Sequence, residues 1–355
     1  MIKHNAIAEV NLKNLAYNYK TLSDLANQSI CAATIKANAY GIGVIKTFEI
    51  LYKNNCRHFF VATTEEALEI REKKLSANLY ILNGLENNKL SIFNDNNIIP
   101  ILNDKDEYNL ICKNIKKYKK LKFGIHVDTG LNRLGLSLNE LLNINFNQMK
   151  VHILISHLSS ADEYKNKYNK VQNKKFKQAI NHMINAKFNS FSNSMGLILG
   201  ENYHYDLVRP GISLYGGHFN TKMKKIIKPV ISLKGKVLQI KEISKNEFVG
   251  YNQTYKTNKK IKVAVLGIGY ADGISRLLSN KGNVYFKNQT FGIVGRVSMD
   301  TITIDITKSS KSIKVGEYME FINHLHGIDK MAKQCNTICD EILTSISDRV
   351  KRIYI

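Results

Sequence analysis

The chain has 355 residues, of which 44% are hydrophobic and 23% are charged. This composition is ordinary for a folded globular protein and excludes disorder, and the length allows two domains. No apolar run approaches the roughly 18 residues that a membrane-spanning helix needs. Residues 1–12 also lack the apolar core and cleavage site of a secretory signal. We therefore expect a cytoplasmic protein with no membrane partner.

The formal net charge of +23 raises the question of a nucleic-acid partner. The lysines are spread over nearly every helix-like segment, and their densest runs, at 114–123 and 173–178, carry no recognisable nucleic-acid module. The five cysteines have no disulfide-type spacing, and Cys335 and Cys339 lack the further ligands of a metal site. The sequence predicts no nucleic-acid partner, no metal and a reducing compartment.

After a helix-like segment at 14–28, eight apolar strand-like runs alternate with amphipathic helix-like segments. Intervals of this length suit right-handed crossovers between parallel strands. Eight such units in about 200 residues predict a (β/α)8 barrel. The runs are residues 30–36, 58–63, 78–82, 98–102, 121–129, 150–158, 189–194 and 203–209.

From about residue 228 the pattern changes to short alternating stretches with turn signals, which is typical of a β-rich domain. We expect the barrel over residues 12–222 and the β-rich domain over 223–355. The N-terminal strand in residues 1–11 is expected to join the second domain. The predicted fold class is therefore α/β, with a (β/α)8 TIM-type barrel followed by a β-rich C-terminal domain.

Conspicuous polar residues fall at the carboxyl ends of the predicted barrel strands, where barrels of this type carry their chemistry. Taken singly, Lys36 could be a charge that reaches solvent, His157 a core histidine, and Ser194 a helix N-cap. Their placement at one end of the barrel instead predicts a single site. Its residues are Lys36, Arg133, His157, Asn193, Ser194, Arg209, Gly211 and Ile212.

A lysine at a desolvated barrel mouth favours the neutral amine, which can form a Schiff base with an aldehyde. Pyridoxal phosphate is a candidate aldehyde. Its phosphate needs backbone amides and hydroxyls, which Ser194, Gly211 and Ile212 offer after the seventh and eighth strands. Tyr40 could add a phenolic hydroxyl. These residues predict a cofactor site around Lys36 that requires no metal.

Nine motifs resemble those of the alanine racemases, in the same order and over essentially the whole chain. They are TIKANAYGIG, VDTGLNRLGL, SHLSSADE, FSNS, DLVRPGISLYGG, VGYNQTY, GIGYADG, GRVSMD and DEILTSISDRVKR. The resemblance implies a fold-type III pyridoxal phosphate enzyme that interconverts L-alanine and D-alanine and supplies D-alanine for bacterial peptidoglycan. It also implies a homodimer in which each site is completed by the partner chain.

The resemblance further implies a role for each catalytic residue. Lys36 would hold the cofactor and act as one base, and Tyr251 of the partner subunit would act as the other. Two bases are needed because inversion at Cα removes a proton from one face and returns one to the other. Arg209 would face the pyridine nitrogen, to which a guanidinium cannot readily give a proton, and so would favour racemisation over transamination. His157 would link Arg209 to the tyrosine.

The remaining site residues receive binding roles from the same resemblance. Arg133 would anchor the substrate carboxylate, assisted by the backbone amide of Met299 of the partner subunit, and Tyr270 would line the access channel. Tyr40, Ser194, Gly211 and Ile212 would hold the cofactor phosphate, and Asn193 would support the cofactor.

Three positions depart from the family pattern. His126 stands where many members have a carbamylated lysine that orients the anchoring arginine, so carbamylation is excluded here. Ser298 replaces a common cysteine, which should matter little because the backbone amide makes the contact. Asp340 replaces a tyrosine that reaches the phosphate and the channel. Because a carboxylate beside a phosphate would be repelled, Asp340 is expected to point elsewhere or to face a cation, and selection against larger substrates should be relaxed.

Three other functions remain as alternatives to the alanine racemase interpretation. The chain could be a related racemase with serine, basic or broader specificity. It could also be a non-catalytic pyridoxal phosphate-binding protein, although such carriers are typically a lone barrel. A nucleic-acid-binding function would rest on the net charge alone.

Overall fold

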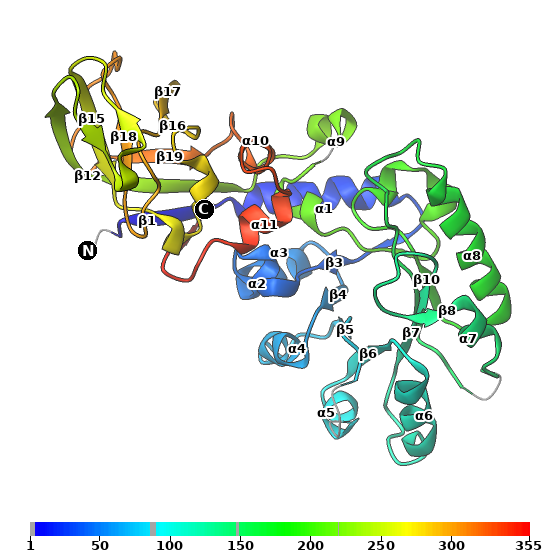
Figure 1. Ribbon diagram of the computed structural model, residues 1–355. Helices are drawn as coiled ribbons and strands as arrows, with labels where there is room; N and C mark the ends of the chain where they lie inside the picture. Colours follow the sequence, from blue (N-terminus) through cyan, green and yellow to red (C-terminus); the bar gives the residue numbers. More distant parts are fainter. Residues whose placement is uncertain (1–3, 86–89, 147–148, 219) are drawn as a thin grey trace.

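The computed structural model describes residues 4–85, 90–146, 149–218 and 220–355. These residues form a barrel and a strand-rich part, which the long strand β12 (Ile231–Ile243) connects (Figure 1). None of the helices in these ranges is long and apolar enough to cross a bilayer.

All eight predicted strand runs contribute strands to the barrel. The first run is divided into two short strands on either side of Ala32. The strands are β2 (Ile30–Cys31), β3 (Ala33–Thr34), β4 (His58–Val61), β5 (Asn78–Ile81), β6 (Ile98–Leu102), β7 (Gly124–Asp128), β9 (Ile153–Ile155), β10 (Phe188–Ser190) and β11 (Leu207–Val208).

The barrel strands are parallel and form a closed ring. They pair in the order β3, β4, β5, β6, β7, β9 and β10, and the short strand β8 (Leu136–Ser137) pairs with β7. Strand β11 pairs with β2, and the N–H of Arg209, directly after β11, donates to the carbonyl of Ser192, just after β10, at 2.8 Å, which closes the ring. Apolar side chains fill the interior, which is therefore a packed core. They include Ala32, Phe60, Tyr80, Ile99, Ile101, Ile153, Ile155 and Leu207.

Helices surround the barrel, and several begin at sequence-encoded caps. Thr63 and Glu66 form a capping box at α4, and the Asp104 side chain accepts from the Glu107 N–H at the start of α6. The helices are α1 (Leu12–Ala26), α3 (Val44–Lys53), α4 (Thr64–Arg71), α5 (Leu90–Asp95), α6 (Lys105–Asn114), α7 (Leu138–Leu142), α8 (Tyr168–His182) and α9 (Thr221–Ile226).

The strand-rich part is built on one sheet with the order β17, β16, β19, β12, β1 and β20, and β15 pairs with both β12 and β18. Strand β1 lies antiparallel to β12 and parallel to β20, so the two ends of the chain meet beside β12 (Figure 1). Besides β12, the strands are β1 (Ala6–Val10), β13 (Phe248–Val249), β14 (Tyr255–Lys256), β15 (Ile261–Leu266), β16 (Asn283–Phe286), β17 (Gln289–Gly292), β18 (Ile302–Asp305), β19 (Tyr318–Ile322) and β20 (Lys351–Tyr354).

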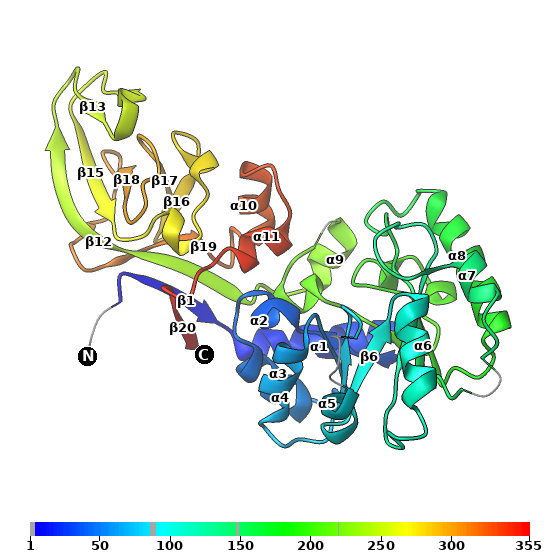
Figure 2. The same ribbon diagram turned by 60° about the horizontal axis from the view of Figure 1, so that its bottom comes forward.

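The last part of the chain returns to the barrel mouth. Helices α10 (Ile328–Gln334) and α11 (Cys339–Thr344) lie between the sheet and the barrel (Figure 2). Gly41 has a φ of +81°, and a Cβ there would overlap the Leu343 carbonyl oxygen of α11. The Arg352 guanidinium donates to the Gly41 carbonyl at 2.8 and 3.1 Å. The C-terminal segment therefore holds the turn that follows the first barrel strand.

Candidate active site

A cavity of about 590 Å³ lies at the carboxyl ends of the barrel strands. This volume is typical of a cofactor or substrate pocket. Nine of the site residues predicted from the sequence line it, together with His126 and the C-terminal residues Ile338 and Asp340. The nine are Lys36, Tyr40, Arg133, His157, Asn193, Ser194, Arg209, Gly211 and Ile212.

Lys36 leaves the first barrel strand in an unusual backbone turn. It opens the short helix α2 (Lys36–Tyr40), in which residues 37–40 all have φ values between 52 and 54°. These left-handed values cost an L-residue roughly 1–2 kcal/mol each. The Ala37 N–H donates to Glu66 Oε1 at 2.6 Å, and the Ala62 N–H donates to Glu66 Oε2 at 2.7 Å. Glu66 thus ties the strained turn to the end of β4.

The surroundings of Lys36 favour its neutral form. Burial, and secondly the charge of Arg133, lower the pKa of the Lys36 amine, while Asp340 and Glu66 act in the opposite direction. A lowered pKa leaves more free amine at neutral pH, and the free amine is the nucleophilic form.

Arg209 lies inside the barrel mouth at the end of β11 and is 6% exposed. Its guanidinium donates to Ser190 Oγ and, at 2.6 Å, to the Ser156 carbonyl, and it lies 5.7 Å from the centre of the Phe60 ring. Burial lowers the pKa of Arg209 to about 9. The side chain therefore stays a cation at neutral pH and is fixed by its strand neighbours. Among the described residues, no hydrogen bond joins it to the His157 ring.

The two histidines of the cavity are held neutral. Burial, followed by the charge of Arg209, lowers the pKa of His157 well below its usual value and that of His126 to about 4. The Asn103 amide donates to two main-chain carbonyls, so its Oδ1 accepts from His126 Nδ1–H at 2.9 Å. That bond leaves His126 Nε2 without a proton.

A small cradle of donors lies where the seventh and eighth strands end. Ser194 Oγ accepts from the N–H groups of Gly211, at 2.9 Å, and Ser213, at 3.3 Å. Ile212 begins η3 (Ile212–Tyr215), and its N–H has no acceptor within the described ranges. A Cβ on Gly211 would overlap Tyr40 Oη. Burial raises the pKa of Tyr40, which keeps this hydroxyl a donor.

Asn193 and Ser194, which follow β10, accept hydrogen bonds from different backbone segments. Asn193 Oδ1 accepts from the N–H groups of Met195, at 3.1 Å, and Gly196, at 2.9 Å. Asn193 therefore caps the turn that Ser194 could have capped, and Ser194 faces the cradle instead.

Arg133 is carried by a loop that one carboxylate organises. Asp128, the last residue of β7, accepts at Oδ1 from the N–H groups of Gly130, Leu131 and Asn132 at 2.8, 3.0 and 3.2 Å. The Arg133 side chain is exposed and lines the cavity, and in the part of the chain that the structure describes no hydrogen bond or ion pair occupies its guanidinium.

Asp340 lines the cavity and does not point away from it. Burial is the main cause that raises the pKa of its carboxyl, and Lys36 acts in the opposite direction. Of the two arrangements expected from the sequence, the structure has the one in which Asp340 faces a cation.

Tyr251, Tyr270 and Met299 lie on the strand-rich part and do not line this cavity in the single chain. They are exposed by 67, 43 and 51%, respectively. Tyr251 opens η4 (Tyr251–Gln253), and Tyr270 opens η5 (Tyr270–Asp272), which is bonded to the Ser298–Met299 turn through the Tyr270 and Ala271 N–H groups. The Met299 N–H has no acceptor among the described residues.

Sequence reasoning missed three residues that hold the site in shape, namely Glu66, Asn103 and Asp128. Glu66 had a signal, because Thr63-x-x-Glu66 reads as a capping box just after a predicted strand. Asp128 also had one, since an aspartate before Thr-Gly commonly binds the following amides. No sequence signal marked Asn103, because only the fold brings it to His126.

Both halves of the chain match known protein families. The alanine racemase N-terminal domain matches residues 10–218, and the alanine racemase C-terminal domain matches residues 230–354. The alanine racemase of Rickettsia africae is 37% identical over 98% of this chain and 98% of its own length. That of Brucella suis is 35% identical over 98% of this chain and 93% of its own. The chain belongs to the alanine racemase family.

Solved structures of this family have the same fold. The alanine racemase from Bartonella henselae, described with covalently bound pyridoxal phosphate, has a TM-score of 0.94 and 36% identity over 99% of this chain and 100% of its own. The alanine racemase from Acinetobacter baumannii has a TM-score of 0.91 and 26% identity over 99% of this chain and 100% of its own. The predicted family and the predicted fold class, a TIM-type barrel followed by a β-rich domain, are confirmed.

Proposed function

We propose that this protein interconverts L-alanine and D-alanine with pyridoxal phosphate as its cofactor. The observation that carries the proposal is the half-buried amine of Lys36, with a lowered pKa, in a cavity that also holds a cradle of hydroxyl and amide donors. Membership of the alanine racemase family supports the same reaction. The D-alanine would serve peptidoglycan synthesis.

The residues of the cavity fit pyridoxal phosphate. Its phosphate suits the cradle, because the Ile212 N–H is unused, Tyr40 offers a hydroxyl, and a side chain at position 211 would fill the space. Its aldehyde suits the Lys36 amine, and its ring nitrogen suits the cationic Arg209. When bound, the cofactor withdraws electrons from the Cα–H bond of an attached amino acid and so makes that proton removable.

The protein's own residues then move the proton. Lys36 Nζ takes or gives it on one face of Cα, and the hydroxyl of Tyr251 of the partner subunit serves the other face. Arg133 binds the substrate carboxylate through a charge-assisted contact. Arg209 stays charged and gives up no proton, which limits protonation of the ring nitrogen and disfavours transamination.

A homodimer would bring the second base to the site. Tyr251, Tyr270 and Met299 are exposed on one chain, and their exposure supports a contact with another copy. The unused Met299 N–H supports its role beside Arg133 at the substrate carboxylate. We assign Tyr270 to the access channel, and His157 and Asn193 to support of the cofactor.

The division into domains and the compartment are also proposals. We place the barrel at residues 12–222 and the β-rich domain, with the strand in 1–11, at 223–355. All five cysteines are free, which supports a reducing cytoplasm.

Circular dichroism of alanine tests the function directly. The purified protein loaded with pyridoxal phosphate should bring L-alanine and D-alanine, started separately, to the same zero signal, since the two enantiomers are equal in free energy. If the circular dichroism signal of alanine persists in both the L-alanine and the D-alanine reactions, the proposal is wrong.

A broader racemase specificity is a second candidate because Asp340 stands in the cavity wall. We expect serine and larger amino acids to be racemised at a measurable fraction of the alanine rate. Asp340→Tyr should lower the serine-to-alanine ratio of kcat/KM about tenfold, because the larger ring narrows the channel. Asp340→Asn keeps the size and isolates the effect of charge. A wild-type protein that excludes serine and all larger amino acids would refute this.

Asp128→Ala should weaken substrate binding. It removes the acceptor of three N–H groups in the loop that carries Arg133, so the KM for alanine should rise about tenfold while kcat changes less. Asp128→Asn, which keeps Oδ1, should stay close to wild type. If Asp128→Ala and Asp128→Asn have equal KM values, Asp128 does not have this role.

A further inference from the structure

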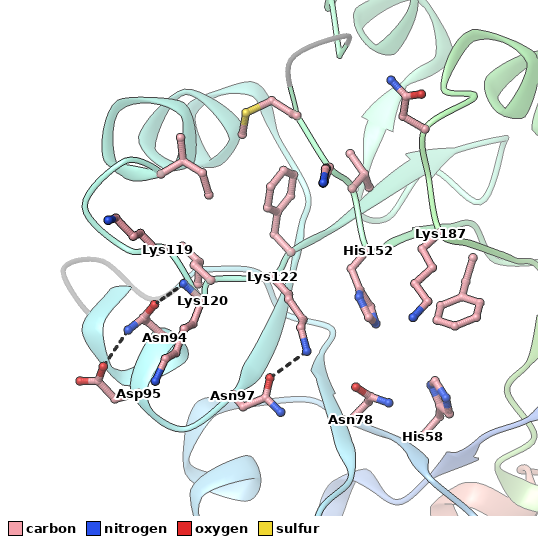
Figure 3. Close-up of a pocket in the computed structure, with 18 residues that line it drawn as sticks. His58, Asn78, Asn94, Asp95, Asn97, Lys119, Lys120, Lys122, His152 and Lys187 are labelled. Carbon is pink, nitrogen blue, oxygen red and sulfur yellow. Dashed lines mark hydrogen bonds between the residues drawn. The ribbon is translucent and has the colours of Figure 1, made fainter.

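The barrel has a second and larger cavity at its opposite end. We call it the floor cavity, and its volume is about 1350 Å³. It opens among the residues that precede or begin the barrel strands β4, β5, β6, β7, β9 and β10, so the packed barrel interior separates it from Lys36. We call the end nearest the barrel strands its inner end, where Figure 3 shows His58, Asn78, Asn97, Lys122, His152 and Lys187, of which Asn97, Lys122 and Lys187 remain exposed to solvent.

The walls of the floor cavity are strongly basic. Five lysines and one carboxylate, that of Asp95, line it, whereas the whole chain has 52 basic and 29 acidic residues. Within the described ranges, none of the five lysines is ion-paired with a carboxylate. Asp95 accepts from Asn94 at the outer side, away from Lys187 (Figure 3). The charge gathered here is therefore denser than the diffuse lysine bias of the chain explains.

Tyr80, which is fully buried, connects the two histidines that line the cavity. Tyr80 Oη lies 2.8 Å from His58 Nδ1 and 3.2 Å from His152 Nε2. Tyr80 has one proton, so it donates to one ring and accepts from the other. With both rings neutral, either arrangement leaves one N–H donor on the other nitrogen of one ring.

Burial, with the charges of the inner lysines as a smaller cause, keeps these rings neutral in the absence of an anion. Burial, followed by the charge of Lys187, lowers the pKa of His58 to about 4. Burial, followed by the charges of Lys122 and Lys187, lowers the pKa of His152 to about 4. Lys122 Nζ donates to Asn97 Oδ1 at 3.2 Å and keeps two further protons for another acceptor.

From these contacts we infer that the floor cavity binds a small anion with two or more phosphate groups. The ammonium groups of Lys122 and Lys187, the Asn78 amide and one imidazole N–H supply donors for one phosphate at the inner end. The lysines at 119, 120 and 150 extend the positive charge outward, which suits an anion of several charges more than a single dianion. The site lies outside the proposed active site and does not depend on the proposed reaction.

Isothermal titration of the pyridoxal phosphate-loaded protein with tripolyphosphate tests the site, because the active-site cradle is then filled. At about physiological ionic strength we expect saturation at one tripolyphosphate per chain. The double variant K122Q/K187Q should bind at least about tenfold more weakly. The matched double variant K174Q/K177Q, with exposed lysines on α8, removes the same charge and should bind within about twofold of wild type.

Three results of the titration would overturn the inference. Equal weakening in both double variants, or titration without saturation, would mean diffuse surface attraction. Citrate that binds as tightly as tripolyphosphate would mean that the site does not select phosphate. If K122Q/K187Q does not fold, the site is tested on the wild-type protein instead, by measuring which lysine amines are acetylated with and without tripolyphosphate. Tripolyphosphate must then protect Lys122 and Lys187 and leave Lys174 reactive, and no protection would reject the site.

Discussion

Lys36→Ala should lower the racemisation rate by at least about 10⁴-fold, because it removes both a base and the amine that holds the cofactor. The substitution should not unfold the protein. The turn after Lys36 is held by main-chain bonds, by Glu66 and by Arg352, none of which involves the Lys36 side chain. The rate is measured by circular dichroism of L-alanine and D-alanine.

The same variant tests the covalent attachment of the cofactor. Borohydride reduction of the loaded wild-type protein should leave the mass of reduced cofactor on the peptide that contains Lys36, and this mass should be absent from Lys36→Ala. Lys20→Ala, an exposed lysine on α1, is the control and should keep both the rate and the labelled peptide. A labelled active-site peptide in Lys36→Ala would reject Lys36 as the attachment residue.

Tyr251→Phe should lower racemisation by about 10²–10⁴-fold, which is the usual contribution of one positioned acid–base group. Lys36 should still exchange the Cα proton of one enantiomer with solvent deuterium, while exchange of the other enantiomer is lost. Nuclear magnetic resonance of each enantiomer in deuterated buffer measures both. Tyr17→Phe, at an exposed tyrosine of α1, should change neither.

Mixing the two inactive variants tests whether the site is shared between subunits. In a mixed dimer of Lys36→Ala and Tyr251→Phe, one site carries both changes and the other carries none. After subunits exchange, about a quarter of all sites should be intact, and activity should return to about that fraction. If Tyr251 instead served its own chain, each site in the mixture would retain one defect, and no activity would return.

Much of the architecture follows from the sequence because it is local in origin. The eight barrel runs are short apolar segments separated by amphipathic helices, and each run forms its strand where the pattern places it. The carboxyl ends of parallel strands meet on one face of a barrel, so the site at Lys36, Arg133 and Arg209 could be predicted from strand order alone. The motifs that resemble alanine racemases identified the family for the same reason, since each is contiguous in the chain.

Other features depend on contacts between segments far apart in the sequence. No local sequence pattern predicts the left-handed backbone of the turn after Lys36, which Glu66 and the C-terminal segment hold by hydrogen bonds. The bond between Asn103 and His126 joins two neighbouring strands, and no spacing rule gives it.

The sequence by itself therefore determined the family, the barrel and the residues that face one another at its mouth, because strand order and local motifs suffice for these. Only the tertiary structure decided that Asp340 enters the cavity beside Lys36, and that Tyr251, Tyr270 and Met299 stay outside it in a single chain. It also brought Lys122 and Lys187 together with His58 and His152 at the barrel floor. Such placements arise from the packing of distant segments, which periodicity does not encode.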